Sequence, residues 1–343
     1  MNEVSKKKYL AFCIAMATTF GVASVTEQFN VTPTVAQTLQ DKIVEEDSFL
    51  QKINIFPVDE LKGEKVLGAV AGVVGKRTDT DNDDREPQEV LALGSKDYEL
   101  FPTEFDTYIK YKTVDTWAKF PNFQDRYVGY VRKAIAMARV RTGWYGTSAA
   151  AVTNKVTNPN GEDVNKGWFQ LMREYDSGSQ WMLQGATAGE IRIGEGGDYP
   201  NLDAAVHDCR QMLEPIFRER GDLVAFIGSD LLAADKAALY AAQGSTPSEK
   251  ERLANEKVTK TYGGLPIATP SGFPSRGLFI TTYDNLSWYY QDTSVRRQVV
   301  DNPKRNRVED YTSVNDGYVV ENEELAAGFE FKNIKIKEGA AWV

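Results

Sequence analysis

The sequence predicts an α+β fold, and three segments of the chain carry that prediction. Residues 121–143 have the apolar spacing of one long helix. The acidic segment Thr78–Glu89 lies between two extended segments, a pattern typical of a long β-hairpin. Residues 190–242 alternate between strand and helix, which indicates a smaller unit with an α/β sheet. With 343 residues, the chain is long enough for two or three compact units.

The first 50 residues are predicted to contain two helices. Lys6–Lys8 precede the apolar run Tyr9–Ala17, which has the form of a secretory signal but is too short for a good membrane span. We favour a different interpretation, in which this run is an apolar helix that docks on a partner. Thr32–Phe49 is predicted to be a helix with Pro33 in its first turn.

The next segment predicts a hairpin that projects from the core. Ile53–Val58 has the composition of a strand, and Glu64–Arg77 is rich in Gly and Val and extended. Thr78–Glu89 has no apolar residue to anchor it. Tyr98–Tyr111 alternates aromatic and polar residues as a half-buried strand does. The simplest architecture is therefore a long arm with a polar tip.

The long helix is predicted to begin after a cap at Asn122 and to end at Gly143 and Gly146. Its predicted buried stripe consists of Tyr127, Val131, Ala134, Ile135 and Ala138. The smaller unit is predicted to follow as strand Glu190–Ile193, helix Asn201–Phe217, strand Leu223–Gly228 and helix Ser229–Ala242. Gly263–Ile280 is expected to be a loop, and Thr281–Tyr290 and Asn315–Ile336 to supply further strands.

Rare residue types exclude several classes of function. The chain has one histidine and two cysteines, too few for a disulfide framework or a structural zinc site. On its predicted helix His207 lies on the polar side and Cys209 on the core side, so a nucleophile–histidine pair is not expected. The net charge of −9 argues against an overall nucleic-acid binder.

Motifs that suggest ligands fail on inspection. Gly72–Arg77 lacks the first glycine and the hydroxyl of a phosphate-binding loop. Asp79, Asp81 and Asp83 have the spacing of a calcium loop, but its glycine and its bidentate glutamate are absent. The aromatic residues of Thr281–Tyr290 are expected in the core. We therefore predict no catalytic residue, no cofactor and no metal.

The remaining signal is the distribution of charge. The predicted hairpin tip has a net charge of about −5 by formal counting, from Asp79, Asp81, Asp83, Asp84, Glu86 and Glu89 against Arg85. Candidate basic partners are Arg132, Lys133, Arg139 and Arg141 on the long helix, and Arg296, Arg297, Lys304, Arg305 and Arg307 near the C-terminus. We expect the tip of one copy to contact a basic surface on its neighbour.

Five blocks of the sequence, in this order, resemble a known family. They are Val31–Ile55, Phe56–Gly72, Tyr108–Arg126, Ile191–Ala204 and Asp292–Glu321. The family is that of the major capsid proteins of tailed phages related to phage P2. The last block contains no nucleophile or ligand cluster, and we interpret it as a surface that fits other protein surfaces.

The resemblance implies an HK97-type capsid fold. It assigns residues 1–50 to an N-terminal arm and residues 64–97 to an extended loop. Residues 51–63, 98–150 and 281–343 are assigned to a peripheral domain with spine helix 122–143, and residues 151–280 to an axial domain.

The resemblance also implies a structural role without enzymatic activity. Copies would form hexamers and pentamers of an icosahedral head, assembled in the host cytoplasm, with the inner shell in non-specific contact with packaged double-stranded DNA. Scaffolding protein, portal protein, and possible maturation protease and decoration protein are the implied partners, and no membrane is involved. Two alternatives remain: a secreted carbohydrate-binding or adhesive protein, and a hydrolase using carboxylates such as Glu195 and Asp198.

Overall fold

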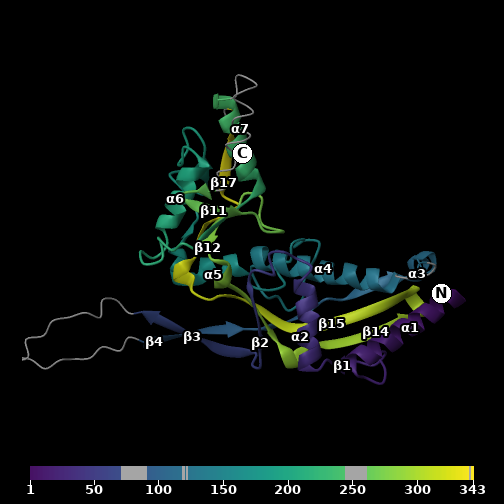
Figure 1. The fold of residues 1–343 in the computed structure, drawn as a ribbon. Coiled ribbons are helices and arrows are strands. Elements are labelled where there is room, and N and C mark those ends of the chain that lie inside the picture. Colours follow the sequence, from purple (N-terminus) through teal and green to yellow (C-terminus); the bar gives the residue numbers. More distant parts are fainter. Residues whose placement is uncertain (71–90, 118–119, 121–122, 244–260, 340) are drawn as a thin grey trace, which may run out of the picture.

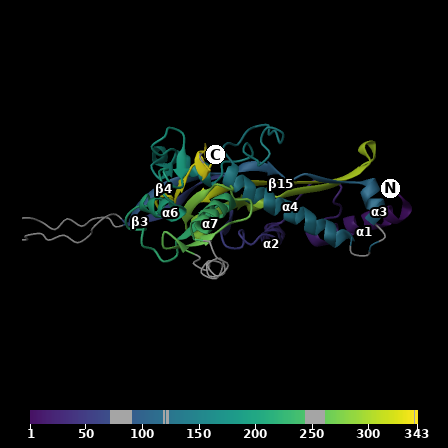
Figure 2. The ribbon, with the colours of Figure 1, turned by 90° about the horizontal axis from the view of Figure 1, so that it is seen from above.

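The described part of the chain consists of an elongated base, a hairpin that projects from one end of it and a tower that stands on it (Figure 1). This computed structural model describes residues 1–343 apart from 71–90, 118–119, 121–122, 244–260 and 340. The N-terminus lies at the end of the base away from the hairpin, and the C-terminus lies in the tower. Seen from above, the hairpin continues the long direction of the base (Figure 2).

A seven-stranded sheet forms the base, in the order β1-β14-β15-β13-β2, with β5 and β6 also pairing with β15. The strands are β1 Phe29–Asn30, β2 Asn54–Val58, β5 Phe101–Glu104, β6 Thr107–Lys110, β13 Leu286–Gln291, β14 Arg296–Asn302 and β15 Arg307–Val320. Block Asp292–Glu321 thus supplies two interior strands. The block is therefore not a free surface throughout, because β15 is paired along most of its length and residues 308–310 and 316–320 are buried. Contact of its exposed residues with other protein surfaces stays a prediction.

The hairpin is confirmed, but its returning strand differs from the prediction. Strands β3 (Lys62–Val70) and β4 (Leu91–Glu99) are antiparallel, in register from Lys62↔Glu99 to Val70↔Leu91. Tyr98–Tyr111 instead contributes β5 and β6 to the base sheet. Alternation identifies a half-buried strand but not the strand with which it pairs. The predicted tip, Thr78–Glu89, and Gly72–Arg77 lie outside the described residues.

In the described part of the chain, the helices of the base are α1 Glu3–Phe20, α2 Pro33–Val44, α3 Tyr111–Trp117, α4 Phe123–Tyr145 and α5 Trp168–Glu174. Helix α1 packs on its own subunit, with Met16 and Phe20 buried and the Gln124 side chain donating to the Lys8 carbonyl at 2.6 Å. The face of α1 that carries Met16 packs within the subunit. The expectation that α1 docks on a partner is therefore wrong for this face. Among the described residues, no helix is both long and apolar enough to cross a bilayer.

Helix α4 is the predicted long helix, rotated from its expected orientation. Ala134 and Ala138 of the predicted stripe are exposed, whereas Ala136, Val140 and Trp144 are buried. The helix also continues through Gly143 to Tyr145. A Cβ at position 143 would lie 2.3 Å from the Trp168 ring, so this glycine serves close packing and not termination. The Asn122 cap lies outside the described residues.

An aromatic cluster joins the base to the tower. The Trp144 ring lies 4.8 Å from Trp168 and 4.9 Å from Phe273 between centroids, and it also contacts Phe226 and Phe279 of the tower sheet. Aromatic pairs at such distances add to the stability gained by burial. Trp288 belongs to the same buried cluster, which confirms the predicted core position of the Thr281–Tyr290 aromatics.

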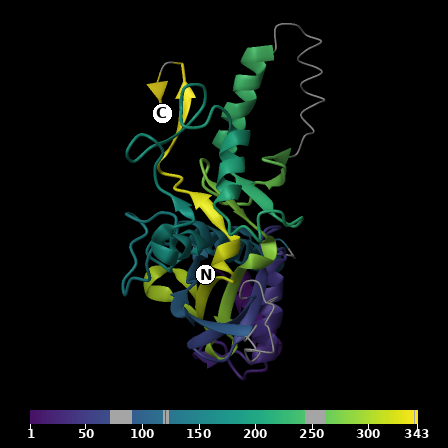
Figure 3. The same cartoon turned by 90° about the vertical axis from the view of Figure 1, so that its left-hand side faces the viewer.

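The described residues of the tower form helices α6 Leu202–Gln211 and α7 Ser229–Gln243 and the strands of two sheets. The tower stands above the base (Figure 3). The six-stranded sheet has the order β10-β11-β9-β12-β16-β7 and the three-stranded sheet the order β18-β17-β8. Their strands are β7 Trp181–Met182, β8 Ile191–Ile193, β9 Val224–Ile227, β10 Thr261–Tyr262, β11 Leu265–Ala268, β12 Leu278–Thr281, β16 Ala327–Phe329, β17 Ile334–Glu338 and β18 Ala341–Trp342.

The tower corrects three predictions. The strands that flank α6, β8 and β9, join different sheets and not one α/β sheet. Gly263–Ile280 is not only a loop, since it contains β11 and most of β12. Ile216 lies beyond the end of α6 and is exposed. His207 is exposed and Cys209 buried, as predicted, with Asn201 capping the helix through the Ala204 amide.

Candidate assembly surfaces

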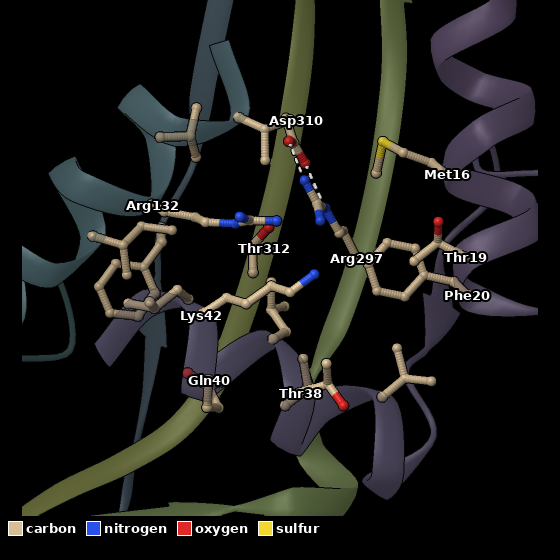
Figure 4. A pocket seen from close by; sticks show the side chains of 18 of the residues that line it. Met16, Thr19, Phe20, Thr38, Gln40, Lys42, Arg132, Arg297, Asp310 and Thr312 are labelled. Atoms are coloured by element: carbon tan, nitrogen blue, oxygen red, sulfur yellow. Dashed lines mark hydrogen bonds and ion pairs between the residues drawn. The ribbon is translucent and has the colours of Figure 1, made fainter. Parts of the chain in front are cut away.

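A cavity of about 340 Å³ lies between α1, α2, α4 and strands β14 and β15; we call it the base groove (Figure 4). Its walls are mostly apolar, because each of these helices turns one apolar stripe toward the sheet. The apolar lining includes Met16 and Phe20 of α1, Leu39 and Ile43 of α2, and Val131 and Ile135 of α4.

Cationic side chains extend into this apolar setting. Arg132, Arg297 and Lys42 reach toward the centre of the groove from three different elements (Figure 4). The Arg297 guanidinium donates to both carboxylate oxygens of Asp310, at 3.0 and 2.6 Å. The Arg132 Nε is buried and has no hydrogen-bond partner among the described residues. The groove therefore attracts negative charge.

Two predicted assembly residues are used within the subunit. The side chains of Arg297 and Asp310 are only 12% and 6% exposed, so this pair is internal. Arg307 donates to Glu309 at 2.5 Å and lies 4.5 Å above the Tyr108 ring. The expectation that Arg297 and Arg307 offer free surface charge is therefore wrong.

The prediction that Arg139 belongs to a basic surface is also wrong. It is 3% exposed, and its guanidinium lies 4.0 Å above the Trp288 ring. Burial lowers the pKa of Arg139 to about 10, while the negative charge of Asp316 opposes that change. Because it lies under the base sheet and not on the solvent face of α4, Arg139 is not available to a neighbouring subunit.

Asp316 is the buried carboxylate near Arg139, and it is not among the residues predicted from the sequence. It accepts hydrogen bonds from the Thr103 hydroxyl at 2.5 Å and the Trp288 indole at 3.1 Å. Burial raises the pKa of Asp316, although the hydrogen bond from Thr103 and the charge of Arg139 lower it. The available signal was an acidic residue placed directly before the mostly apolar run Gly317–Val320.

A second buried carboxylate lies where the tower meets the base. Glu330 accepts from Arg173 Nε at 2.7 Å, from Arg173 Nη2 at 3.1 Å and from the Trp181 indole at 3.1 Å. Burial by itself raises the pKa of Glu330, but the hydrogen bonds and charge of Arg173 outweigh it and lower the pKa. This pair ties α5 to the chain that follows β16.

The other predicted basic residues lie on the surface. Arg132 is partly buried, and the exposed ones are Lys133, Arg141, Arg296, Lys304 and Arg305. Their predicted partners in the tip, Asp79, Asp81, Asp83, Asp84, Glu86 and Glu89, lie outside the described residues. Contact between tip and basic surface stays a prediction. Among the described residues, no group of three His, Cys, Asp or Glu side chains is placed to hold a metal.

Comparison with protein families identifies the chain. A family model described as phage major capsid protein, P2 family, matches residues 8–332. The chain belongs to the P2 family of phage major capsid proteins. The capsid protein of Escherichia phage P2 is 37% identical over 348 residues, covering 98% of this chain and 96% of the relative. The major capsid protein of Serratia phage KSP20 is 33% identical over 311 residues, covering 88% of each.

Solved structures of capsids show the same fold. A chain of the satellite phage P4 procapsid that includes the size determination protein is 36% identical, with a TM-score of 0.70, over 88% of this chain and 99% of that one. The cyanophage A-1(L) capsid chain, at 14% identity, has a TM-score of 0.51 over 83% of this chain and 92% of its own. The fold is thus the HK97-type capsid fold. This P2-family protein is a major capsid protein of a phage head and part of the virion, and the adhesive alternative has no support.

Proposed function

We propose that copies of this major capsid protein assemble as hexamers and pentamers of an icosahedral head that encloses double-stranded DNA. One observation supports this most directly: the 36% identity with a procapsid chain of which it covers 99%. Membership of a shell-forming family already requires self-association of the subunits into capsomers. We also propose that the role is purely structural, without catalysis or a bound cofactor.

We assign the parts of the fold as follows. The base is the peripheral domain with α4 as its spine helix, residues 64–97 form the extended loop, and the first 50 residues form the arm. The tower is the axial domain, for which residues 151–280 were predicted, except that α5 in this range belongs to the base. We extend it to include β16, β17 and β18, because these strands pair with β12, β7 and β8 of the tower.

Other partners are proposed from the family resemblance. A scaffolding protein and a portal protein are expected during assembly, with a maturation protease and a decoration protein as further candidates. The inner shell would meet packaged DNA through non-specific contacts, consistent with the net charge of −9, which disfavours tight phosphate binding by the whole chain.

Contact between the acidic tip and a basic surface of the next subunit is the proposed source of electrostatic stabilisation. The exposed cations Lys133, Arg141, Arg296, Lys304 and Arg305 remain the candidates, whereas Arg139, Arg297 and Arg307 are withdrawn. Each exposed pair contributes only about 0.2–1 kcal/mol, so the effect depends on repetition around every ring.

Electron microscopy of the purified chain tests the assembly proposal. We expect closed shells or rings of subunits, and a monodisperse monomer under all conditions would refute it. The tip contact is tested by changing Asp81, Asp83 and Asp84 together to Lys, which should block assembly and leave the subunit folded. Reversal of Lys133 and Arg141 to Asp should restore it. Normal shells from the triple variant at both low and high salt would show that the tip is only solvated.

A further inference from the structure

We propose that the base groove of one subunit receives the turn between β2 and β3, Asp59–Leu61, of a neighbouring copy. The proposal rests on the proposed self-assembly and names the contact that would serve it. The turn brings two carboxylates and an exposed leucine to a cationic, apolar-walled groove. Four features of the described residues support this match.

The first feature is a set of buried polar atoms in the groove without partners among the described residues. They are Arg132 Nε and Gln40 Oε1, and Gln40 is only 3% exposed. Buried polar atoms in folded proteins are nearly always hydrogen-bonded. The arginine donor suits a carboxylate, and the Gln40 oxygen suits an N–H. A polypeptide offers both groups, whereas a phosphate offers only acceptors.

The second feature is charge. Besides the buried Arg139, three cationic side chains line the groove, Lys42, Arg132 and Arg297, against two carboxylates, Asp125 and Asp310. Asp310 is occupied by Arg297, and Lys42 and Arg132 point into the remaining space (Figure 4). Attraction for a carboxylate is stronger there than at an open surface, because the apolar walls lower the local dielectric constant.

The third feature is size and wall chemistry. A volume of about 340 Å³ is at the small end of ligand sites, so the groove fits a short turn and not a whole helix or a nucleic-acid duplex. Its apolar walls need apolar atoms opposite them. Thr78–Glu89 has carboxylates but no apolar residue, so the acidic tip does not match this groove.

The fourth feature is the turn itself. Asp59 and Glu60 are exposed and form no ion pair among the described residues, and the adjacent Leu61 is 47% exposed. The Gln291 side chain donates to the Asp59 carbonyl, and the Leu100 amide donates to the Leu61 carbonyl, both at 2.8 Å. These bonds hold the turn in one shape, which reduces the entropy lost on binding.

The occupant is a second copy because the two surfaces are separate within one subunit. None of the residues that line the groove belongs to the turn. A contact between two different surfaces of identical chains is heterologous, and its repetition gives a ring when the rotation from copy to copy closes, as a hexamer or a pentamer requires. Every neighbour in a shell of this protein carries both surfaces.

Charge reversal on the full chain tests the proposal. One variant carries Arg132→Glu and Lys42→Glu, and a second carries Asp59→Lys and Glu60→Lys. We expect each to lower shell yield by at least about tenfold, because the loss at one contact is repeated throughout the shell, and the chain with all four changes to recover it. The control carries Arg126→Glu and Lys112→Glu, exposed cations outside the groove, and should assemble as wild type.

Thermal unfolding of unassembled subunits shows whether each variant folds. If the groove variant does not fold, the turn variant still carries the test, since Asp59 and Glu60 are exposed. Normal shell yield from the folded turn variant would overturn the proposal while leaving the proposed function intact. Failure of the wild-type chain to assemble at all would overturn both.

Photo-crosslinking gives a second, independent measurement. Benzoylphenylalanine at Leu39, in the groove wall, is expected to crosslink to Phe56–Lys62 of another copy in shells assembled from a mixture of isotope-labelled and unlabelled chains. Mass spectrometry distinguishes crosslinks between copies from those within one. Crosslinks to another segment, or to a different polypeptide, would overturn the proposal.

Discussion

Two buried carboxylates, Asp316 in the base and Glu330 below the tower, have similar neighbours but opposite electrostatic behaviour. Each accepts a hydrogen bond of 3.1 Å from a tryptophan indole and lies near an arginine, which is partly buried at Glu330 and fully buried at Asp316. Arg173 donates one hydrogen bond to each carboxylate oxygen of Glu330, from Nε and from Nη2. Arg139 instead stacks on Trp288, and its Nε and Nη1 have no partner among the described residues.

This difference in geometry and a difference in burial together account for the opposite pKa changes. Both groups lose hydration on burial, which disfavours the charged carboxylate. At Glu330 the two hydrogen bonds and the charge of Arg173 outweigh that loss, and the pKa falls. Asp316 is more completely buried, and neither its hydrogen bonds from Thr103 and Trp288 nor the charge of Arg139 offsets the loss, so its pKa rises. Proximity of opposite charges therefore does not by itself make a strong buried pair.

The largest expected effect is at Arg173. Arg173→Met leaves the Glu330 carboxylate buried without its partner, which costs about 3–5 kcal/mol in the free energy of unfolding. Urea unfolding of the unassembled subunit measures it. Arg173→Lys keeps the positive charge but not the pair of parallel hydrogen bonds, so it should lower the free energy of unfolding by an intermediate amount. A loss below about 1 kcal/mol for Arg173→Met would contradict the role assigned to this pair.

A smaller effect is expected at Arg139. Arg139→Met removes a desolvated cation–π contact of about 2 kcal/mol, but it also relieves the cost of burying the cation. We expect a net loss of about 1–2 kcal/mol in unfolding free energy, measured in the same way. If the loss in unfolding free energy were as large as that of Arg173→Met, the stacked arginine would be as important for stability as the hydrogen-bonded one, and the comparison would fail.

The two carboxylates should differ in the sign of their pH dependence. Glu330, with a lowered pKa, contributes stability that is present above its ordinary value of 4.5 and is lost as the pH falls. Asp316, with a raised pKa, contributes stability at low pH that is lost as the pH rises above its ordinary value of 3.8.

Urea unfolding across the acidic range compares the wild type with two variants. The stability difference between wild type and Glu330→Gln should grow as the pH rises, and the difference from Asp316→Asn should shrink. Equal slopes for the two variants would mean that the geometry of the arginine does not control the charge of its carboxylate.

The smallest effect is expected at an exposed ion pair. Lys62 and Glu99 lie 2.6 Å apart at the root of the hairpin, with side chains 71% and 46% exposed. Lys62→Ala should cost no more than about 0.2–1 kcal/mol, and 1 M salt should abolish the difference from wild type. A larger, salt-independent loss would indicate that exposure is a poor guide to the value of these pairs.

Local features of the fold were predictable from sequence because their causes are local. The periodicity of residues 121–143 predicted α4, and the extended segments around Thr78–Glu89 predicted the hairpin. The helical spacing around His207 and Cys209 placed one outside and the other inside. Five blocks in order predicted the capsid family, which the comparisons confirm.

Only the tertiary structure decided which charges are free. Arg139, Arg297 and Arg307 are indistinguishable in sequence from the exposed Lys133 and Arg141. Arg139 is internal because Trp288, far along the chain, offers its ring, and Arg297 because the pairing of β14 with β15 brings Asp310 to it. The partner of a strand and the buried face of a helix depend on residues distant in sequence, which local periodicity does not contain.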